Sequence, residues 1–345
     1  MQRCFQLAAF GKGLVAPNPM VGAVLVHNED IIAEGFHHKF GGPHAEVVAL
    51  QNINDAALLK NSILYVNLEP CSHFGKTPPC ADLIIEKQIG QVVIANLDPF
   101  PQVNGSGIEK LKAAGIKVIS GILEKEGRFL NRRFFHFHEK KMPWVILKWA
   151  ETNDGFIASL PENKNERVTL ISNQESRTLV HQWRSEESAI MVGMNTLLTD
   201  NPYLNSRLVN GQNPVRIVLG NGNELPPDLN IFEDKNTSVL IYNFSITEIK
   251  GNAEWVKLEK NGQVLNQLLH DLYKRGLNSL IVEGGTITLS SFINAGLWNE
   301  ARVFKAPHSL GSGIAAPKLP NAKVLTNQAI GSDRLCCIIN TENFN

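Results

Sequence analysis

The sequence predicts an α/β protein with two domains, each built on its own sheet. At 345 residues the chain exceeds the usual size of one hydrophobic core, so two domains are expected. Strand-like and helix-like segments alternate up to about residue 125, and a second alternating series begins at residue 144. The stretch between them, residues 131–143, is dense in charged and aromatic side chains and closes with a proline. We therefore predict domains over residues 1–140 and 143–345.

The first series opens with a predicted hairpin. VGAVLVH and IIAEGFH, at 21–27 and 31–37, are short apolar runs separated by the turn-forming sequence NED. HAEVVALQNI, at 44–53, spaces its apolar residues as a helix does. The remaining elements predicted here are a buried strand in 62–70, an amphipathic helix in 80–89, a strand in 91–99, a helix in 107–115 that stops at a glycine, and a strand in 116–123.

The second series contains apolar runs of strand length separated by longer polar segments. The strands predicted here lie at 144–150, 188–194, 215–220, 237–243, 277–285 and 335–341. The strand that ends in EGG is followed at once by a predicted helix that begins at Thr286. No internal repeat or low-complexity tract interrupts the series.

Charge and composition exclude several classes of protein. Thirty-three basic residues balance thirty-three acidic ones, so the chain has no overall field for nucleic acid or an anionic membrane. No apolar run approaches the roughly 18 residues of a spanning helix, and the first residues, MQRCFQLAAFGKG, do not complete a signal-peptide core. Five cysteines, an odd number, do not form a disulfide framework. We expect a cytoplasmic protein that binds neither membrane nor nucleic acid.

One histidine and two cysteines of the first series form a candidate metal site. His44 opens a helix, Cys71 follows a strand, and Cys80 lies at the start of the next helix. Three such ligands are the number found in catalytic zinc sites, which leave a fourth position for water. Glu46, two residues after His44, is placed to carry protons between that water and a substrate, as in the H-x-E and P-C-x-x-C pattern of zinc deaminases.

The spacing of the two cysteines departs from that pattern. Eight residues separate Cys71 from Cys80 instead of two, and the longer loop carries His73, Lys76 and Thr77. These polar groups suit a substrate larger than a plain nucleoside. The competing interpretation is that an isolated cysteine is a buried apolar residue. We expect the three others, Cys4, Cys336 and Cys337, to be core or surface residues without a role.

The second series gives weaker signals when judged residue by residue. A Gly-Gly turn into a helix that carries Thr286 and Thr288 would suit a phosphate group, although such a turn is more often a plain chain reversal. There is no G-x-G-x-x-G. Arg184 and Arg207 could bind a phosphate bidentately, or they could be solvated surface residues. Asp200, before Asn-Pro, would ordinarily be a turn residue.

Four stretches together resemble the bifunctional deaminase–reductase family of riboflavin biosynthesis. They are PNPMVGAVLV, GGPHAEVVAL, NLEPCSHFGKTPPC and NLDPFPQVNGSGIEKLKAAGI, and the residues from 143 onward resemble the reductase half. The resemblance implies a cytidine-deaminase-like three-layer α/β/α domain followed by a dihydrofolate-reductase-like α/β domain. It also implies zinc ligands at His44, Cys71 and Cys80, a proton donor at Glu46, and substrate contacts at Asn18, His73 and Lys76. One zinc ion would serve each deaminase site.

The resemblance further implies that the second domain uses NADPH. Catalytic polar residues near the reacting ribose would be Lys148, Asp200 and Glu283. Substrate positions would be Val168, Arg184, Leu204, Arg207 and Glu283. NADPH positions would be Ala150, Leu170, Ser172, Thr196, Asp200, Gly285, Thr286, Ile287, Thr288, Leu289, Ser290 and Ser291. The sequence departs from the family pattern at Phe100, Val168, Leu170, Lys305 and His308, where the family usually has Asn, Ser, Trp, an apolar residue and Lys.

The resemblance predicts two successive reactions on one small molecule. Zinc-dependent hydrolysis would remove the 2-amino group of 2,5-diamino-6-(5-phosphoribosylamino)pyrimidin-4(3H)-one, and NADPH would then reduce the ribosyl chain to ribityl. We also expect a homo-oligomer, a dimer or a tetramer. A deaminase that edits nucleic acid is one alternative, but it would need a basic, aromatic-rich face. A zinc-stabilised scaffold is another, but it would not need Glu46.

Overall fold

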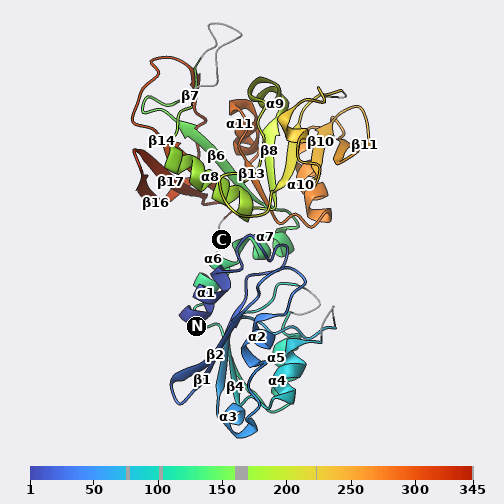
Figure 1. Cartoon of the computed structure of the whole chain (residues 1–345), viewed down its shortest axis with the longest axis vertical. Helices are drawn as coiled ribbons and strands as arrows, with labels where there is room; N and C mark the ends of the chain where they lie inside the picture. Colours follow the sequence, from blue (N-terminus) through green and yellow to red (C-terminus); the bar gives the residue numbers. More distant parts are fainter. Residues whose placement is uncertain (75–77, 101–103, 160–169, 223, 344–345) are drawn as a thin grey trace. The chain divides into compact units, whose positions relative to one another are not determined.

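The computed structural model describes residues 1–74, 78–100, 104–159, 170–222 and 224–343, and they form two compact units (Figure 1). The units are Met1–Lys141 and Met142–Asn345. Most of the predicted boundary stretch forms a helix, α7 (Arg132–Lys140). The helix ends at Lys141, whose backbone is in the left-handed conformation. Within the described ranges, no helix is both long enough and apolar enough to cross a membrane.

The first unit is built on a mixed sheet with strand order β2-β1-β3-β4-β5. Its strands are β1 (Gly22–His27), β2 (Asp30–Phe36), β3 (Ile63–Leu68), β4 (Gln91–Asn96) and β5 (Lys117–Ser120). The first two form the predicted antiparallel hairpin, β3 lies antiparallel to β1, and β4 and β5 continue parallel to β3. Each strand predicted for this unit is therefore present.

Helices cover both faces of this sheet, so the unit has three layers. The helices are α1 (Gln2–Ala9), α2 (Ala45–Leu50), α3 (Ala56–Lys60), α4 (Cys80–Glu86), α5 (Ser106–Ala113), α6 (Glu124–Leu130) and α7. Because side chains alternate along a strand, Leu25 packs into the core with α2, α4 and α5 while Val24 packs against Leu7 of α1. The predicted α/β/α arrangement is confirmed. The short helices α1, α3 and α6 were not predicted.

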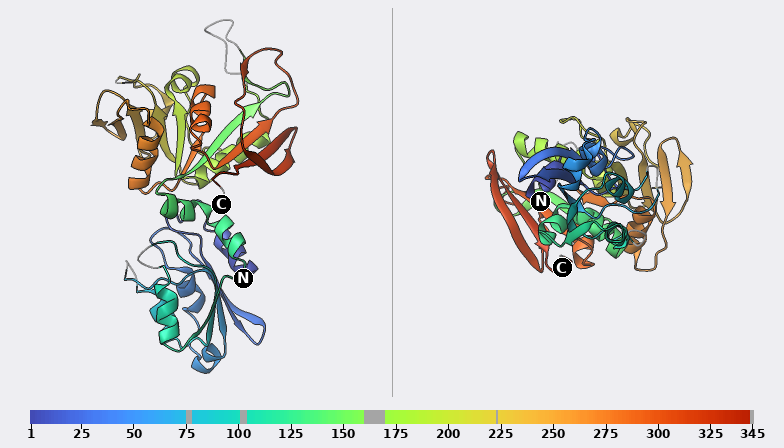
Figure 2. Two further views of the ribbon diagram at one scale, coloured as in Figure 1. Left: turned by 180° about the vertical axis from the view of Figure 1, so that it is seen from behind. Right: turned by 90° about the horizontal axis from the view of Figure 1, so that it is seen from below.

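The second unit contains a ten-stranded sheet in the order β11-β12-β10-β9-β8-β13-β6-β14-β17-β16. Its strands are β6 (Trp144–Glu151), β8 (Ala189–Gly193), β9 (Val215–Leu219), β10 (Val239–Asn243), β11 (Glu248–Lys250), β12 (Ala253–Lys257), β13 (Ser279–Val282), β14 (Glu300–Lys305), β16 (Ala322–Ile330) and β17 (Asp333–Asn340). From β12 to β14 the neighbours are parallel, whereas β11, β16 and β17 add antiparallel pairs at the two ends (Figure 2). A separate short ladder pairs β7 (Phe156–Ala158) with β15 (Ile314–Ala315).

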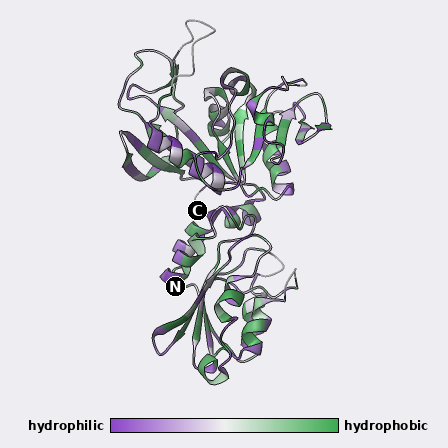
Figure 3. Cartoon of the chain, viewed as in Figure 1, coloured by the Kyte–Doolittle hydropathy of each residue, from purple (hydrophilic) through white to green (hydrophobic). Residues whose placement is uncertain are grey.

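Two pairs of helices cover the parallel part of this sheet, one pair on each face. Helices α8 (Gln174–Glu186) and α9 (Met194–Asp200) pack with Ile281, and α10 (Val264–Lys274) and α11 (Thr286–Asn294) pack with its neighbour Val282. The strands between them are apolar on both faces, as Figure 3 shows by their nearly continuous hydrophobic colour. The carboxyl ends of β6, β8 and β13 therefore meet at one edge, where polar side chains from different strands can converge.

Candidate active sites

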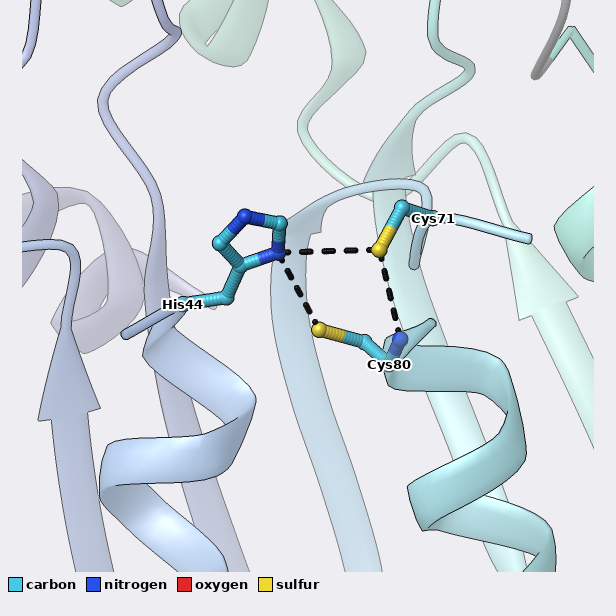
Figure 4. A group of neighbouring side chains, drawn as sticks. All are labelled: His44, Cys71 and Cys80. Carbon is cyan, nitrogen blue, oxygen red and sulfur yellow. Dashed lines mark hydrogen bonds between the residues drawn. The ribbon is translucent and has the colours of Figure 1, made fainter. Parts of the chain in front are cut away.

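The first site lies in the first unit, where His44, Cys71 and Cys80 converge (Figure 4). Their ligand atoms all lie within 4.8 Å of one another. His44 Nδ1 is 3.6 Å from Cys71 Sγ and 3.3 Å from Cys80 Sγ. His44 is the residue that precedes the first turn of α2, and Cys80 is the first residue of α4, so two helix starts and the segment after β3 build the cluster.

The donor set fits a zinc ion. The backbone N–H of Cys80 donates to Cys71 Sγ over 3.2 Å. Hydrogen bonding from the Cys80 side chain, together with His44, lowers the pKa of Cys71 to about 4 against the opposing effect of burial. The same hydrogen bond raises the pKa of Cys80, so in the absence of a metal the pair favours a negative charge on Cys71. Thiolate and imidazole are the ligands that zinc prefers.

Glu46 stands in the first turn of α2 and is buried, with 3% of its surface exposed. Burial raises its pKa to about 7, and the nearby Cys71 charge adds to the shift. A carboxyl group with such a pKa can both accept and release a proton near neutral pH, which is what a general acid–base residue must do.

The predicted substrate contacts of this unit are only partly described. Asn18 contacts His37, which in turn contacts the metal-ligand cluster. Asn18 Nδ2 is 3.1 Å from His37 Nε2, and the ring centroids of His37 and His44 are 5.6 Å apart. His73 is exposed, and its ring centroid is 6.1 Å from that of Phe100. Lys76 lies outside the described residues. His37 was not predicted, because its sequence signal is no more than a histidine at the end of a strand.

The second site lies at the carboxyl edge of the second unit's sheet, where a buried carboxylate meets two cations. Glu283, directly after β13, accepts hydrogen bonds from Arg184 Nε at 2.8 Å and Nη2 at 2.7 Å. Lys148 Nζ of the neighbouring strand β6 lies 3.7 Å from Glu283 Oε2. The structure thus brings together three predicted residues from α8, β6 and the end of β13.

This cluster should make the stability of the second unit pH-dependent. Burial alone would raise the pKa of Glu283 from 4.5, but Arg184 and Lys148 outweigh burial and lower it to about 2. The folded state then binds fewer protons than the unfolded state, so the stabilisation is complete above pH 4.5 and is lost as pH falls towards 2. We expect the free energy of unfolding to lose about 3 kcal/mol over that range through this residue.

Urea unfolding followed by tryptophan fluorescence measures this effect, because all five tryptophans lie in the second unit. Glu283→Gln, which cannot titrate, should lose the corresponding part of the pH slope. If the unfolding free energy depended on pH equally in the parent and the variant, Arg184 and Lys148 would not be lowering the pKa of Glu283.

Asp200 is not joined to this cluster. It is the last residue of α9 and is exposed, and its carboxylate makes no hydrogen bond or ion pair with any residue in the described ranges. Burial of part of its side chain raises its pKa, and no neighbouring charge contributes. Its predicted place beside Lys148 and Glu283 therefore stays a prediction.

Two glycine turns bring three of the predicted NADPH positions, Thr196, Gly285 and Thr288, side by side. A Cβ on Gly193 would lie 2.5 Å from Thr288 Oγ1, and one on Gly285 would lie 3.0 Å from Thr196 Oγ1. The turn between β8 and α9 therefore touches the turn between β13 and α11, whose free N–H groups suit a phosphate.

The other predicted NADPH positions differ in what they can offer. Ile287 and Leu170 are exposed, whereas the Leu289 side chain is buried in the core and leaves only its backbone for a ligand. Ala150 lies on β6, Ser172 precedes α8, and Ser290 and Ser291 follow on α11. Val168 lies outside the described residues.

Asn205 connects the two predicted substrate arginines. Its carbonyl oxygen accepts from Arg184 Nη1 at 3.2 Å, and its side-chain oxygen accepts from Arg207 Nη1 at 3.0 Å. The buried residue before it, Leu204, has φ +50, a left-handed conformation that non-glycine residues adopt rarely. Such strain is held in place by its surroundings, and it clusters at binding sites.

His181 is a further polar residue of this region that the sequence analysis missed. It stands one turn before Arg184 on α8 and is 5% exposed, and its Nδ1 has no partner among the described residues. Burial and the Arg184 charge lower its pKa to about 4. A histidine three residues before an arginine is the only sequence signal it offers, and the helix that carries both, α8, was not predicted.

Comparison with known proteins agrees with both sites. Family models match residues 1–96 as a cytidine and deoxycytidylate deaminase zinc-binding region and residues 143–337 as a RibD C-terminal domain. The riboflavin biosynthesis protein RibD of Aquifex aeolicus is 40% identical over 324 residues, which cover 91% of this chain and 88% of that protein. The chain belongs to the RibD family. The RibD of Synechocystis is 36% identical over 97% of this chain and 94% of its own.

Solved structures of RibD proteins share the fold over nearly the full length. The deaminase/reductase of Thermotoga maritima superposes with a TM-score of 0.87 at 37% identity, covering 99% of this chain and 97% of its own. RibD of Acinetobacter baumannii gives a TM-score of 0.89 at 31% identity with the same coverage. The predicted fold of each half is confirmed, and so is the prediction of a bifunctional deaminase and reductase of riboflavin biosynthesis. Zinc and NADPH are the cofactors of this RibD-family chain.

Proposed function

We propose that residues 1–140 deaminate 2,5-diamino-6-(5-phosphoribosylamino)pyrimidin-4(3H)-one and that residues 143–345 reduce the deaminated product with NADPH. The observation that carries the first step is the convergence of two thiols and an imidazole beside a buried carboxyl group. Three ligands and an adjacent acid–base residue are what hydrolytic deamination requires. The related Thermotoga protein is described as the deaminase and reductase of these compounds.

In the deaminase site, His44, Cys71 and Cys80 would hold the zinc ion. A zinc ion held there supplies a hydroxide nucleophile at neutral pH. Glu46 would take the proton from the attacking water and deliver it to the 2-amino nitrogen. The C–O bond forms first by addition to the amidine carbon, the C–N bond then breaks and ammonia leaves, and the remaining hydroxyl proton moves to a ring nitrogen to give the carbonyl. Asn18, His73 and Lys76 would contact the substrate.

In the reductase site, the turns at Gly193 and Gly285 would hold the phosphates of NADPH, which supplies a hydride to C1 of the opened ribose. Burial lowers the pKa of Lys148 and so makes proton donation easier. Lys148 would donate the proton that balances the hydride, and Glu283 would hold Lys148 and Arg184 in place.

The partners and compartment of the chain are also part of the proposal. We propose the reducing cytoplasm, because two of the five cysteines are assigned to zinc and the odd number does not suit a disulfide framework. The substrate is a small molecule, and the balanced net charge gives no support for a nucleic-acid partner. From the family resemblance we propose a homo-oligomer, a dimer or a tetramer.

Product analysis tests the proposed substrate. The purified chain, given the diaminopyrimidine phosphate without NADPH, should release one equivalent of ammonia, and later addition of NADPH should give the ribityl compound. Ammonia release from cytidine or from a single-stranded oligonucleotide, with none from the diaminopyrimidine phosphate, would overturn the assignment.

Arg207→Ala should raise the KM of the reductase step about 10-fold or more without changing NADPH affinity. Arg207 and Arg184 both donate to Asn205, so we place both at the substrate phosphate. A charge-assisted hydrogen bond to phosphate contributes about 1.5–3 kcal/mol. Initial rates with pre-deaminated substrate measure the effect. Arg207→Lys, which keeps the charge but not the bidentate geometry, should fall between the variant and the parent. A weaker NADPH affinity with an unchanged substrate KM would place Arg207 on the cofactor side.

A further inference from the structure

Glu69 is a buried acidic residue to which the mechanism above gives no role. It follows β3 and directly precedes Pro70 and Cys71, and 4% of its surface is exposed. Its carboxylate is surrounded by backbone N–H groups from two other segments of the unit. The donors are Asp98 N at 3.2 Å and Gly105 N at 3.0 Å on Oε2, and Gly107 N at 2.9 Å and Ile108 N at 3.2 Å on Oε1.

These contacts suit a carboxylate and no neutral side chain. A carboxylate accepts at both oxygens, whereas an amide would turn an NH2 group towards two of the N–H donors. Gly107 and Ile108 belong to the first turn of α5, where N–H groups lack helical partners and the helix dipole favours negative charge. Through these hydrogen bonds Glu69 connects the start of α5 and the segment after β4 to residues 69 and 70, which directly precede Cys71.

Two further contacts join residues 69–72 to α5, and we call this line of contacts the seam. A Cβ on Gly107 would overlap the carbonyl oxygen of Pro70, so the helix backbone lies directly against the segment that precedes Cys71. Ser106 Oγ lies 2.6 Å from Ser72 Oγ, on the other side of Cys71. Residues 69–72 are therefore fixed to α5 along their length.

On its opposite side Cys71 is held by α4. The N–H of Cys80 donates to Cys71 Sγ at 3.2 Å, and the N–H of Ala81 donates to the Cys71 carbonyl at 3.1 Å. His44 directly precedes α2 and Cys80 is the first residue of α4, whereas Cys71 adjoins neither helix. The position of Cys71 relative to the other two ligands therefore depends on what holds residues 69–72.

We propose that Glu69 is a positioning residue of the deaminase site, which acts through the backbone of Cys71 to set the geometry of the three metal ligands. The proposal rests on the zinc-ligand assignment made above. It predicts that loss of the carboxylate weakens metal binding beyond what loss of stability alone would cause.

Zinc affinity separates this role from a purely structural one. In Glu69→Gln we expect the zinc dissociation constant, measured by competition with a chelator, to rise about 10-fold or more, as for other residues that orient metal ligands. The cobalt-substituted protein should show a weaker sulfur-to-cobalt absorption. The matched control is Leu111→Ala, which removes a buried side chain from the same helix, α5, and touches no hydrogen bond of the seam.

The proposal holds if Glu69→Gln loses zinc affinity while Leu111→Ala, at a similar melting temperature, keeps the affinity of the parent. Equal affinities for both variants, or parent affinity in Glu69→Gln, would overturn it. If Glu69→Gln does not yield folded protein, Gly107→Ala tests the same contact, because its Cβ would displace the Pro70 carbonyl and crowd the Glu69 carboxylate without removing the charge. A parent chain that binds no zinc, or whose zinc survives Cys80→Ser, would instead refute the ligand assignment.

Discussion

Glu46→Gln abolishes ammonia release while the zinc content stays at that of the parent. The amide cannot carry a proton, and proton transfer by a positioned side chain contributes 10²- to 10⁴-fold, so we expect kcat to fall about 1,000-fold. Glutamine has nearly the same volume, and His44, Cys71 and Cys80 all remain. Ammonia production by the purified variant, with metal content by elemental analysis, is the measurement.

Asp82→Asn is the control for this variant, because it removes a half-buried carboxylate, paired with Lys110, from α4 in the same unit. We expect the control to deaminate at the parent rate. NADPH-dependent reduction of pre-deaminated substrate should be normal in both. Ammonia release by Glu46→Gln within a factor of a few of the parent would show that another group shuttles the proton.

Cys80→Ser loses zinc and deamination together. A neutral hydroxyl is a poor zinc ligand, and the site has two other protein ligands among the described residues, His44 and Cys71. We expect less than about a tenth of the parent's zinc after gel filtration, and ammonia release below detection.

The matched control for the zinc measurement is Cys4→Ser, which changes another buried cysteine of the same unit that lies outside the cluster. It should keep one zinc per chain. Full zinc occupancy in Cys80→Ser would remove Cys80 from the ligand set.

The zinc cluster could be predicted because each member has a local sequence signal. His44 directly precedes helix α2 and Glu46 lies in its first turn, and Cys71 and Cys80 each stand near a strand end or at a helix start that periodicity identifies. The strands of the first unit, and β6, β8, β9, β10, β13 and β17 of the second, were predicted for a similar reason, since buried strands are short continuous apolar runs. The strands β7, β11, β12, β14 and β15 were not predicted.

What the sequence did not predict depends on contacts between distant residues. Arg184 and Glu283 are 99 positions apart, and the sequence around each residue gives no sign that the two form an ion pair. Glu69 stands in a motif that was singled out, but its role comes from N–H groups about 30 to 40 residues later. The exposed strand β16 lacks the apolar run that identifies a buried strand, so it was missed.

The order of the two reactions in zinc-depleted protein tests the central claim most directly. The chain, stripped of zinc, is given NADPH with either the diaminopyrimidine phosphate or its deaminated product, while ammonia and NADPH are both followed. We predict that the deaminated product is reduced at the parent rate, that the starting compound gives neither ammonia nor NADPH oxidation, and that added zinc restores both at one NADPH per ammonia. Ammonia release without zinc, or NADPH oxidation on the starting compound without ammonia, would contradict a zinc-dependent deamination that precedes a separate reduction.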